Sequence, residues 1–406
     1  MIKRYFSYFI IAVFALVSFS SCEKEVAVTD IMLDHATVAL TIGESMTLTA
    51  TVHPLDATDK SVIWGSSNYK IADVNDRGDV TARGPGTATI TVITKDGRYK
   101  ATCAVIVNAR PLTPKITMKF KMSYIERAWS LVLAGSGIIN INWGDGSAIE
   151  PYTLTPAWSY YSPNSSGVKD VTISGENITH LRGSLLQLST IDVSKAVELR
   201  HLDFQNDFLR SFDLSKNINL TYLNCSNTSL QNLDVNNNTL LTVLICYDNW
   251  LTSLDVSKLT ELRELCTCNN FELNNLDLSK NIKLERLCIG HRTKVSNGFS
   301  NLDLSNNTAL TSLSCTNNLL ASLDVSNNTA LTYLYCDNNE LTSLDVSNNT
   351  LLSFLDIQNN QFTCDELNAL FKTLHENGGT IYIDKNPGTD SCDKSIATER
   401  GWMVLP

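Results

Sequence analysis

The sequence predicts a mainly β protein in which two β-sandwich domains precede a repeat solenoid with a small α/β cap at its C-terminal end. Three observations predict this fold. Residues 31–108 and 115–177 contain short runs of alternating apolar and polar residues separated by turn signals, a pattern typical of stacked β-sheets. Residues 178–362 repeat one apolar pattern about every 21 residues, which indicates a solenoid. Residues 363–406 leave the repeat and include a helical pattern.

The composition is that of a folded, acidic protein. Of the 406 residues, 43% are hydrophobic and 18% are charged, which is enough apolar material for extended cores. The formal net charge of −10 disfavours nucleic acid as a partner, because its phosphate backbone attracts basic proteins. Eleven cysteines are too few for a fold held together mainly by disulfides.

Residues 1–21 are expected to be an export signal, because two basic residues precede a long apolar run. Small residues then lead into Cys22, and the segment resembles the signal peptide of bacterial lipoproteins. The resemblance implies that Cys22 is lipidated and that residues 22–30 are a tether; Phe19 departs from the small aliphatic residue of that pattern. The alternative is an ordinary secretory signal with a chance cysteine. Residues 23–25, Glu-Lys-Glu, resemble the acidic tracts that follow the lipidated cysteine in surface-exported lipoproteins of Bacteroidetes. This resemblance implies a lipid-anchored, surface-exposed protein of the bacterial outer membrane.

The first sandwich spans residues 31–108 and is followed by a linker, 109–114. Its segments TIGESMTLTATVHP and VIWGSSNYKIADVNDRGDVTARGPGTATITV resemble the bacterial Ig-like domain of group 2. The resemblance implies a spacer or an adhesive module of a surface protein. Trp64 is expected to pack in the core, and Cys103 to point inward without a disulfide partner.

The second block, residues 115–177, carries the motif INWGDGS at residues 141–147. The motif resembles the PKD-type sandwich, in which the tryptophan packs in the core and Gly-Asp-Gly forms a tight turn. Asp145 is one carboxylate in a turn, far from the six to eight oxygen ligands that calcium takes, so we expect no metal there. The block is expected to cover the N-terminal end of the solenoid.

The repeat is clearest in residues 331–351, LTYLYCDNNELTSLDVSNNTL. Its first half resembles the leucine-rich repeat, with cysteine at a usual leucine position. Six apolar positions in each frame cannot close a core alone, but stacked turns bury a continuous one. The second half of the frame is expected to form a short strand or an extended turn. The nine frames begin at Ile178, Leu199, Leu220, Leu241, Leu262, Leu284, Leu310, Leu331 and Leu352.

Two polar positions recur in the repeat. The asparagine at the ninth position, Asn339 in the example, is expected to satisfy backbone groups of its own and adjacent turns. The aspartate of the LDVS segment, Asp345 in the example, is followed by serine or asparagine, which favours turn capping. Calcium binding by the row of aspartates is the alternative.

The cysteines fall into three groups. Those at the inward sixth position are expected to behave as small hydrophobes: Cys225, Cys246, Cys315 and Cys336. Cys266, Cys268 and Cys288 lie at outward positions; Cys266 and Cys288 share a position on neighbouring turns, although parallel in-register strands fit a bridge poorly. Cys364 and Cys392 are the disulfide candidate of the C-terminal cap, which spans residues 363–406 and is expected to begin with a helix over 365–375.

The third, fifth and seventh positions of each frame are expected to point outward along the strands and to form a recognition surface. Tyrosine offers a large contact area at low entropic cost, but an aromatic column that only stabilises the sheet is the alternative. Residues 291–299 insert a loop with Arg292 and Lys294, either a tolerated insertion or a contact loop. The candidate ligand-binding residues are His201, Tyr222, Tyr247, Tyr333, Tyr335, Asp337 and Phe354.

The sequence contains no motif of catalysis, metal binding or dinucleotide binding among those with a known mechanism, and its six histidines are scattered. We therefore expect a non-enzymatic cell-surface protein without a cofactor or metal, whose repeats bind a protein or a glycan and which is attached to the membrane through Cys22. One alternative is the glycan-binding component of a polysaccharide-capture system. The other is a passive structural envelope lipoprotein.

Overall fold

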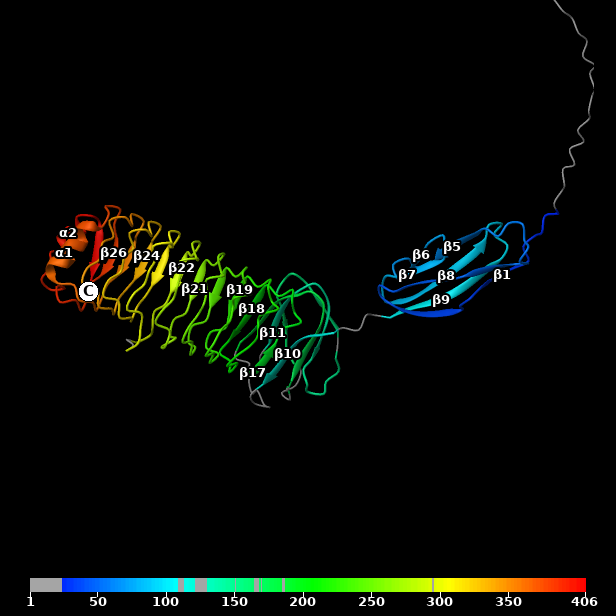
Figure 1. Ribbon diagram of the computed structural model, residues 1–406, viewed down its shortest axis with the longest axis horizontal. Coiled ribbons are helices and arrows are strands. Elements are labelled where there is room, and N and C mark those ends of the chain that lie inside the picture. Colours follow the sequence, from blue (N-terminus) through cyan, green and yellow to red (C-terminus); the bar gives the residue numbers. More distant parts are fainter. Residues whose placement is uncertain are drawn as a thin grey trace, which may run out of the picture. The chain divides into compact units, whose positions relative to one another are not determined.

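The computed structural model describes residues 24–108, 113–120, 130–149, 151–163, 168, 170–184, 187–293 and 296–406. The predicted signal peptide, Cys22 and most of the linker lie outside these residues. The chain separates into two compact units, residues 1–111 and 112–406, which are described individually (Figure 1). No helix of the described residues is long and apolar enough to cross a bilayer.

Unit 1 is a β-sandwich. Its core lies between a four-stranded sheet, β2-β9-β8-β5, and a three-stranded sheet, β3-β7-β6. Cys103 is buried and free, as predicted, and Trp64 is half-buried against the core. The strands are β1 (Asp30–Leu33), β2 (Thr37–Thr41), β3 (Ser45–Thr47), β4 (Ala50–His53), β5 (Val62–Ser66), β6 (Ala72–Val74), β7 (Asp79–Ala82), β8 (Gly86–Thr94) and β9 (Lys100–Asn108).

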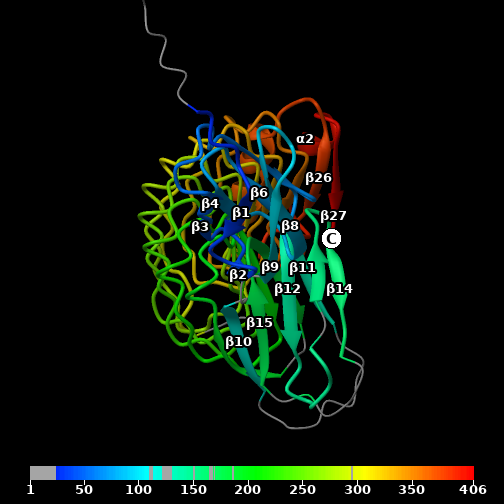
Figure 2. The ribbon, with the colours of Figure 1, turned by 90° about the vertical axis from the view of Figure 1, so that its right-hand side faces the viewer.

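Unit 2 begins with two facing sheets that merge into the solenoid. One sheet has five strands in the order β13-β12-β15-β10-β17, and the other begins β14-β11-β16 and continues through the repeats to β27 (Figures 1 and 2). The predicted PKD-like block therefore shares one hydrophobic core with the solenoid, from Ile116 to Trp402. The strands of this region are β10 (Pro114–Phe120), β11 (Leu131–Gly135), β12 (Gly137–Asn142), β13 (Pro151–Leu154), β14 (Ser159–Tyr161), β15 (Val171–Gly175), β16 (Ile178–Ser184) and β17 (Leu188–Asp192).

The solenoid has about 11 turns, and each contributes one parallel strand. The register is regular, because the central leucine of each strand pairs with that of the next, as Leu313 does with Leu334 and Leu334 with Leu355. The strands are β18 (His201–Gln205), β19 (Tyr222–Asn224), β20 (Val243–Ile245), β21 (Glu264–Cys266), β22 (Arg286–Cys288), β23 (Ser312–Ser314), β24 (Tyr333–Tyr335), β25 (Phe354–Asp356), β26 (Gly379–Tyr382) and β27 (Trp402–Leu405).

The second half of each frame is an extended turn. In each of eight turns, an aspartate oxygen accepts the backbone N–H of the residue two positions later, for example Asp345 from Ser347 at 2.8 Å. At Asp324, hydrogen bonds from the Ser326 side chain and backbone N–H lower the pKa of the exposed carboxyl. The turn-capping interpretation of the aspartates is therefore confirmed.

The predicted amide position is also confirmed. Asn339 is fully buried; its Oδ1 accepts the N–H of Leu320 at 3.1 Å, and its Nδ2 donates to the carbonyls of Cys315 and Cys336 at 3.0 and 3.1 Å. One side chain thus satisfies backbone groups on two turns. The four inward cysteines are buried and free, and burial raises the pKa of the Cys225 thiol to about 12.

The C-terminal cap contains α1 (Cys364–Thr373), close to the predicted 365–375, and the short α2 (Ser395–Thr398). A capping box joins Thr363 and Glu366, which explains where α1 begins. Leu367, Leu370 and Phe371 of α1 are buried against the last turns. The helices lie at the end of unit 2 away from β10 and β17 and thereby close the apolar core (Figure 1).

Candidate binding site

Unit 2 exposes one continuous side of its long sheet. Each strand of the repeats buries its central leucine, such as Leu334 in β24, and directs its neighbours Tyr333 and Tyr335 outward, because side chains alternate along a strand. In-register pairing then aligns equivalent positions of successive turns into columns. We call the outward side of β14, β11, β16 and β18–β27 the strand face.

At its N-terminal end the strand face carries a cluster of aromatic rings. His201 stacks on Tyr222 with ring centroids 4.0 Å apart, and Trp158 meets the rings of His180 and His201 edge-on at 5.1 and 4.9 Å. Burial, together with His180 and Arg182, lowers the pKa of His201 to about 4. The imidazole is therefore neutral at physiological pH, and the cluster presents uncharged ring surface.

Some positions predicted to point outward are covered in the first turns, which corrects the sequence-based expectation. Asp203, Asn224 and Ser226 are buried. Arg182 lies over Asp203 with its Nε 3.3 Å from the carboxylate, and Asn224 accepts hydrogen bonds from Ser226. These buried side chains are therefore inaccessible at the surface and serve to support it.

A second aromatic cluster lies at the C-terminal end of the strand face. The ring centroid of Phe354 lies 4.7 Å from that of Tyr335 and 5.5 Å from that of Tyr382, and Tyr333 is 46% exposed. Beside these rings, burial raises the pKa of the Asp356 carboxyl to about 6, with a contribution from the negative charge of nearby Asp337.

The predicted ligand-binding residues therefore form two groups. His201 and Tyr222 belong to the N-terminal cluster, whereas Tyr333, Tyr335, Asp337 and Phe354 belong to the C-terminal one. The five strand steps from β19 to β24 separate the two groups by about 24 Å. Tyr247 lies between them, half-buried. A ligand that contacts both groups must be extended.

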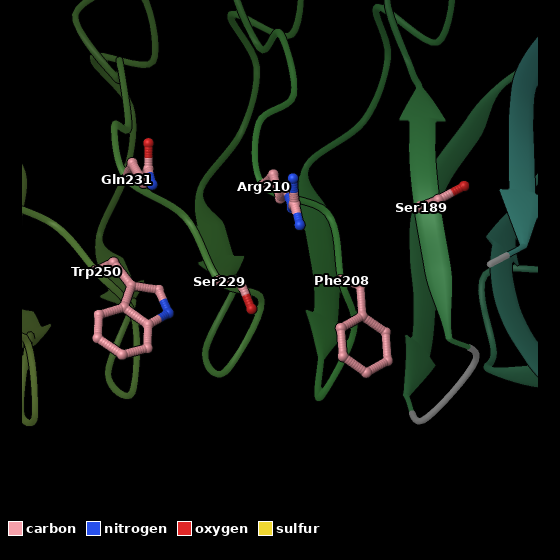
Figure 3. A pocket seen from close by; sticks show the side chains of 6 residues that line it. All are labelled: Ser189, Phe208, Arg210, Ser229, Gln231 and Trp250. Atoms are coloured by element: carbon pink, nitrogen blue, oxygen red, sulfur yellow. The ribbon is translucent and has the colours of Figure 1, made fainter.

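The structure also shows a groove that the sequence analysis missed. It lies along an edge of the first turns, has a volume of about 670 Å³, and places the exposed rings of Phe208 and Trp250 on either side of Ser229 (Figure 3). All three residues occupy the tenth position of their frames. Comparing that position between frames would have shown the aromatic pair, but the position lies outside the leucine pattern. The lining residues are Ser189, Phe208, Arg210, Ser229, Gln231 and Trp250.

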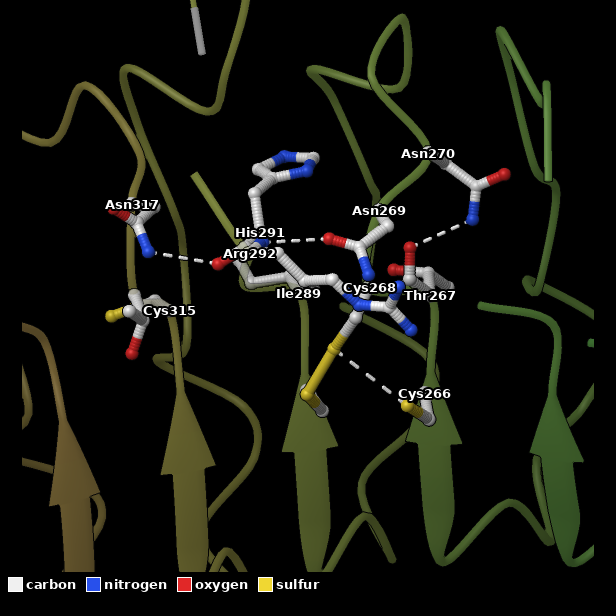
Figure 4. Close-up of a disulfide and its surroundings, with 12 residues drawn as sticks. Cys266, Thr267, Cys268, Asn269, Asn270, Ile289, His291, Arg292, Cys315 and Asn317 are labelled. Atoms are coloured by element: carbon white, nitrogen blue, oxygen red, sulfur yellow. Dashed lines mark hydrogen bonds between the residues drawn. A yellow bond between two sulfur atoms is a disulfide. The ribbon is translucent and has the colours of Figure 1, made fainter. Parts of the chain in front are cut away.

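Three cysteines meet on the strand face where the repeat length changes. The disulfide joins Cys268 to Cys288, not Cys266 to Cys288, although Cys266 and Cys288 are register partners. Cys268 lies two residues beyond the register partner of Cys288, so the bridge runs diagonally between the two turns. The Cα atoms of the bridged pair are 5.9 Å apart, within the usual range for a disulfide. The Cys266 thiol lies 3.7 Å from Cys268 Sγ (Figure 4). In the described part of the chain, this is the one group of three potential metal ligands whose ligand atoms lie within 4.8 Å of one another.

The proposed bridge between Cys364 and Cys392 is not formed in the structure. Both thiols are free and turn towards backbone carbonyls: Cys364 Sγ lies 3.2 Å from the carbonyl oxygen of Ser391, and Cys392 Sγ lies 3.5 Å from that of Thr389. The capping box and the packing of α1 hold this end of the chain in place of the predicted disulfide.

The inserted loop is tied to the solenoid. The guanidinium of Arg292 lies 2.6 Å from the carboxylate of Asp248, and its backbone N–H donates to Asn269. Phe299 is buried at the end of the loop. Lys294 lies outside the described residues. For Arg292 these contacts support the interpretation as a surface insertion, because its charge is paired within the chain.

Comparisons with known proteins identify unit 1. Residues 27–105 match the bacterial Ig-like domain (group 2). Over 71 residues the chain is 51% identical to a kappa-carrageenase of Pseudoalteromonas carrageenovora, covering 18% of each protein. Over 84 residues it is 40% identical to an Ig-like virion protein of Serratia phage KSP90, covering 20% of this chain and 33% of the phage protein. The chain spans at most a third of the length of these two relatives, and the carrageenase match is a partial Ig-like match.

A solved structure resembles the solenoid. The functional domain of InlJ from Listeria monocytogenes, described as including a cysteine ladder, is 33% identical, with a TM-score of 0.50, over 58% of this chain and 50% of that chain. The fold is therefore an N-terminal Ig-like domain and a leucine-rich-repeat solenoid with a small helical cap. The chain thus belongs to the class of multidomain proteins that join an Ig-like domain to a leucine-rich-repeat solenoid. This combination fits a non-enzymatic binding role.

Proposed function

We propose that this chain is a non-enzymatic adhesion protein of the bacterial cell surface that binds a protein or a glycan through unit 2. The observation that supports this proposal is the strand face, which exposes large aromatic side chains beside polar groups. Tyr160 is 76% exposed, Tyr333 46% and Trp158 43%. Tyrosine and tryptophan are enriched at protein interfaces, because they bury much area with few rotatable bonds. Unit 1 then acts as a spacer.

The proposal is tested by capturing partners with the full mature chain and measuring the affinity of each purified partner. Because a few exposed aromatic residues dominate most interfaces, the combined variant Tyr160→Ala and Tyr333→Ala is expected to weaken binding at least tenfold. Tyr69→Ala is the matched control, since the exposed fraction of Tyr69, 65%, lies between those of Tyr160 and Tyr333 and the residue belongs to unit 1. Unchanged binding by the double variant contradicts the strand-face proposal. If the full mature chain captures neither a protein nor a glycan, the result favours a passive envelope protein.

Attachment to the outer membrane is a further part of the proposal. Lipidation of Cys22 supplies two or more acyl chains, which are needed for stable anchoring. Cys22→Ser is expected to abolish incorporation of labelled palmitate and to move the protein from the membrane fraction to the soluble fraction. Protease treatment of intact cells tests whether the repeats face outward. A Cys22→Ser protein that still sediments with membranes contradicts the lipid anchor.

A further inference from the structure

The groove beside Ser229 has the shape of a slot between two rings. Phe208, Ser229 and Trp250 occupy the same position on three successive turns, and strands spaced about 4.8 Å apart place the two aromatic positions about 10 Å from each other. Serine at the middle position leaves the space between the rings open (Figure 3). Trp250 is 59% exposed and Phe208 42%.

Four polar side chains that line the slot have no partner among the described residues, whereas the Ser189 hydroxyl donates to the carbonyl of Lys119 at 3.2 Å. Among the described residues, the Arg210 guanidinium, the Ser229 hydroxyl, the Gln231 amide and the Trp250 indole N–H form no hydrogen bond or ion pair with another side chain or the backbone. Their backbone is fixed, since the N–H of Trp250 donates to Leu230 at 2.8 Å and that of Arg210 to Thr228 at 3.2 Å. The turns that carry these side chains are therefore already in place, which lowers the backbone part of the entropic cost of binding.

This combination matches the chemistry of a sugar chain. Pyranose rings have apolar C–H faces that pack on aromatic rings, and their rims carry hydroxyl groups that accept and donate hydrogen bonds. A protein segment that buries apolar anchors requires apolar pockets, whereas here a serine, Ser229, stands between the two rings. Arg210 adds a fork of donors that suits a carboxylate or a sulfate, and no acidic side chain of the described residues pairs with it.

We propose that this slot is a glycan-binding site and that Arg210 selects a sugar with an acidic substituent. The inference rests on the proposed binding function and deepens it by naming a site and a ligand class. In this arrangement Trp250 and Phe208 hold the sugar faces, Ser229 and Gln231 bond to hydroxyl groups, and Arg210 pairs with the acidic group.

The test applies the full mature chain to an array of neutral, uronic-acid, sialylated and sulfated glycans, and then measures the affinity for the best acidic glycan and its neutral counterpart. Trp250→Ala is expected to weaken both at least tenfold, as truncation of a central aromatic contact does. Arg210→Gln is expected to weaken the acidic glycan about tenfold or more and the neutral one much less, because it removes a charge-assisted pair. Melting curves verify that both variants fold.

Tyr69→Ala is the control, since Tyr69 is exposed, belongs to unit 1 and does not line the slot. Glycan binding lost in Trp250→Ala and retained in Tyr69→Ala supports the inference. The inference is overturned if no glycan binds, if Trp250→Ala binds as the wild type does, or if the slot variants abolish capture of a protein instead. Glycan binding that depends on Tyr333 alone overturns the slot but leaves the proposed binding function standing.

Discussion

At the scale of single residues, the ninth position of the frame shows why the turns stay in register. The Asn339 amide replaces water for an N–H on the preceding turn and for carbonyls on its own and the preceding turn. A second column of buried asparagines, in the LDVS half of the frame, acts in a similar way: Asn328 donates to the carbonyls of Leu304 and Asn307. The sequence analysis identified the first column and missed the second.

Asn339→Ala is expected to lower the free energy of unfolding by about 2–4 kcal/mol, because it leaves buried backbone groups without partners. Asn348→Ala is the control: Asn348 is exposed and donates a single hydrogen bond to Ser326, so its loss should cost less than about 1 kcal/mol. Urea denaturation of the two variants measures the difference. Equal effects would show that the buried amide does not stabilise the stack.

Asp356 is expected to destabilise the folded protein at neutral pH. Its folded pKa is about 6, above the ordinary 3.8, so the folded state binds the proton more tightly than the unfolded state. The destabilisation is absent below pH 3.8, grows as the pH rises to 6 and is complete above it. Asp356→Asn should therefore raise the free energy of unfolding by about 1 kcal/mol at pH 7.5, a value reduced for solvent screening, and by nearly nothing at pH 4.

The measurement is thermal or urea unfolding of Asp356→Asn at both pH values. Asparagine retains the oxygen that accepts the N–H of Gln358, so the substitution removes the charge and keeps this hydrogen bond. Asp390→Asn, which replaces a carboxylate at an exposed position, is the control and should change the free energy of unfolding by less than about 0.5 kcal/mol. Stabilisation of Asp356→Asn that is the same at pH 4 and pH 7.5 would contradict the role of the buried charge.

At the scale of elements, the repeated strand was predictable because the same evidence occurs nine times. Each frame has a leucine at its fourth position, between two outward residues. A single exception elsewhere in a frame, such as Thr267 at the position that several other frames fill with cysteine, therefore does not hide the pattern. The cysteine bridge was not predictable in the same way. Cys268 lies where frames of different length meet. Its disulfide partner, Cys288, is the register partner of Cys266, two residues earlier, and the repeat pattern does not predict such a diagonal pairing.

Replacing Cys268 by serine is expected to move the disulfide to Cys266 and Cys288. The two residues face each other on adjacent strands, and their sulfur atoms lie within 4.8 Å. Non-reducing digestion with mass spectrometry should find the Cys268–Cys288 peptide in the wild type and the Cys266–Cys288 peptide in the variant. Cys364→Ser, which changes a thiol far along the chain, should leave the wild-type pairing intact. A free Cys288 in the variant would show that Cys266 cannot reach it.

At the scale of the whole molecule, the first turns of unit 2 depend on a block that the sequence assigns to a separate domain. β16 pairs with β11 on one side and with β18 on the other, so a single strand belongs to both parts. The WGDG motif indicates a turn and a core tryptophan, but it carries no information on which sheet the neighbouring strands join. Such pairing is non-local, and the block occurs once, so the sequence offers no repetition from which to infer it.

A fragment that starts at residue 178 is therefore expected to be unstable, whereas one that starts at residue 113 should fold. The cut at 178 removes β11 from the edge of β16 and uncovers buried residues such as Leu181 and Leu202, because Ile116, Met118 and Leu133 share their core. We expect fragment 178–406 to bind a hydrophobic dye, to associate and to melt at a lower temperature than fragment 113–406, since a solenoid without its end cover exposes apolar surface. Calorimetry and size-exclusion chromatography compare the two. Equal melting temperatures and a monomeric 178–406 would show that the repeats form a closed unit without the preceding block.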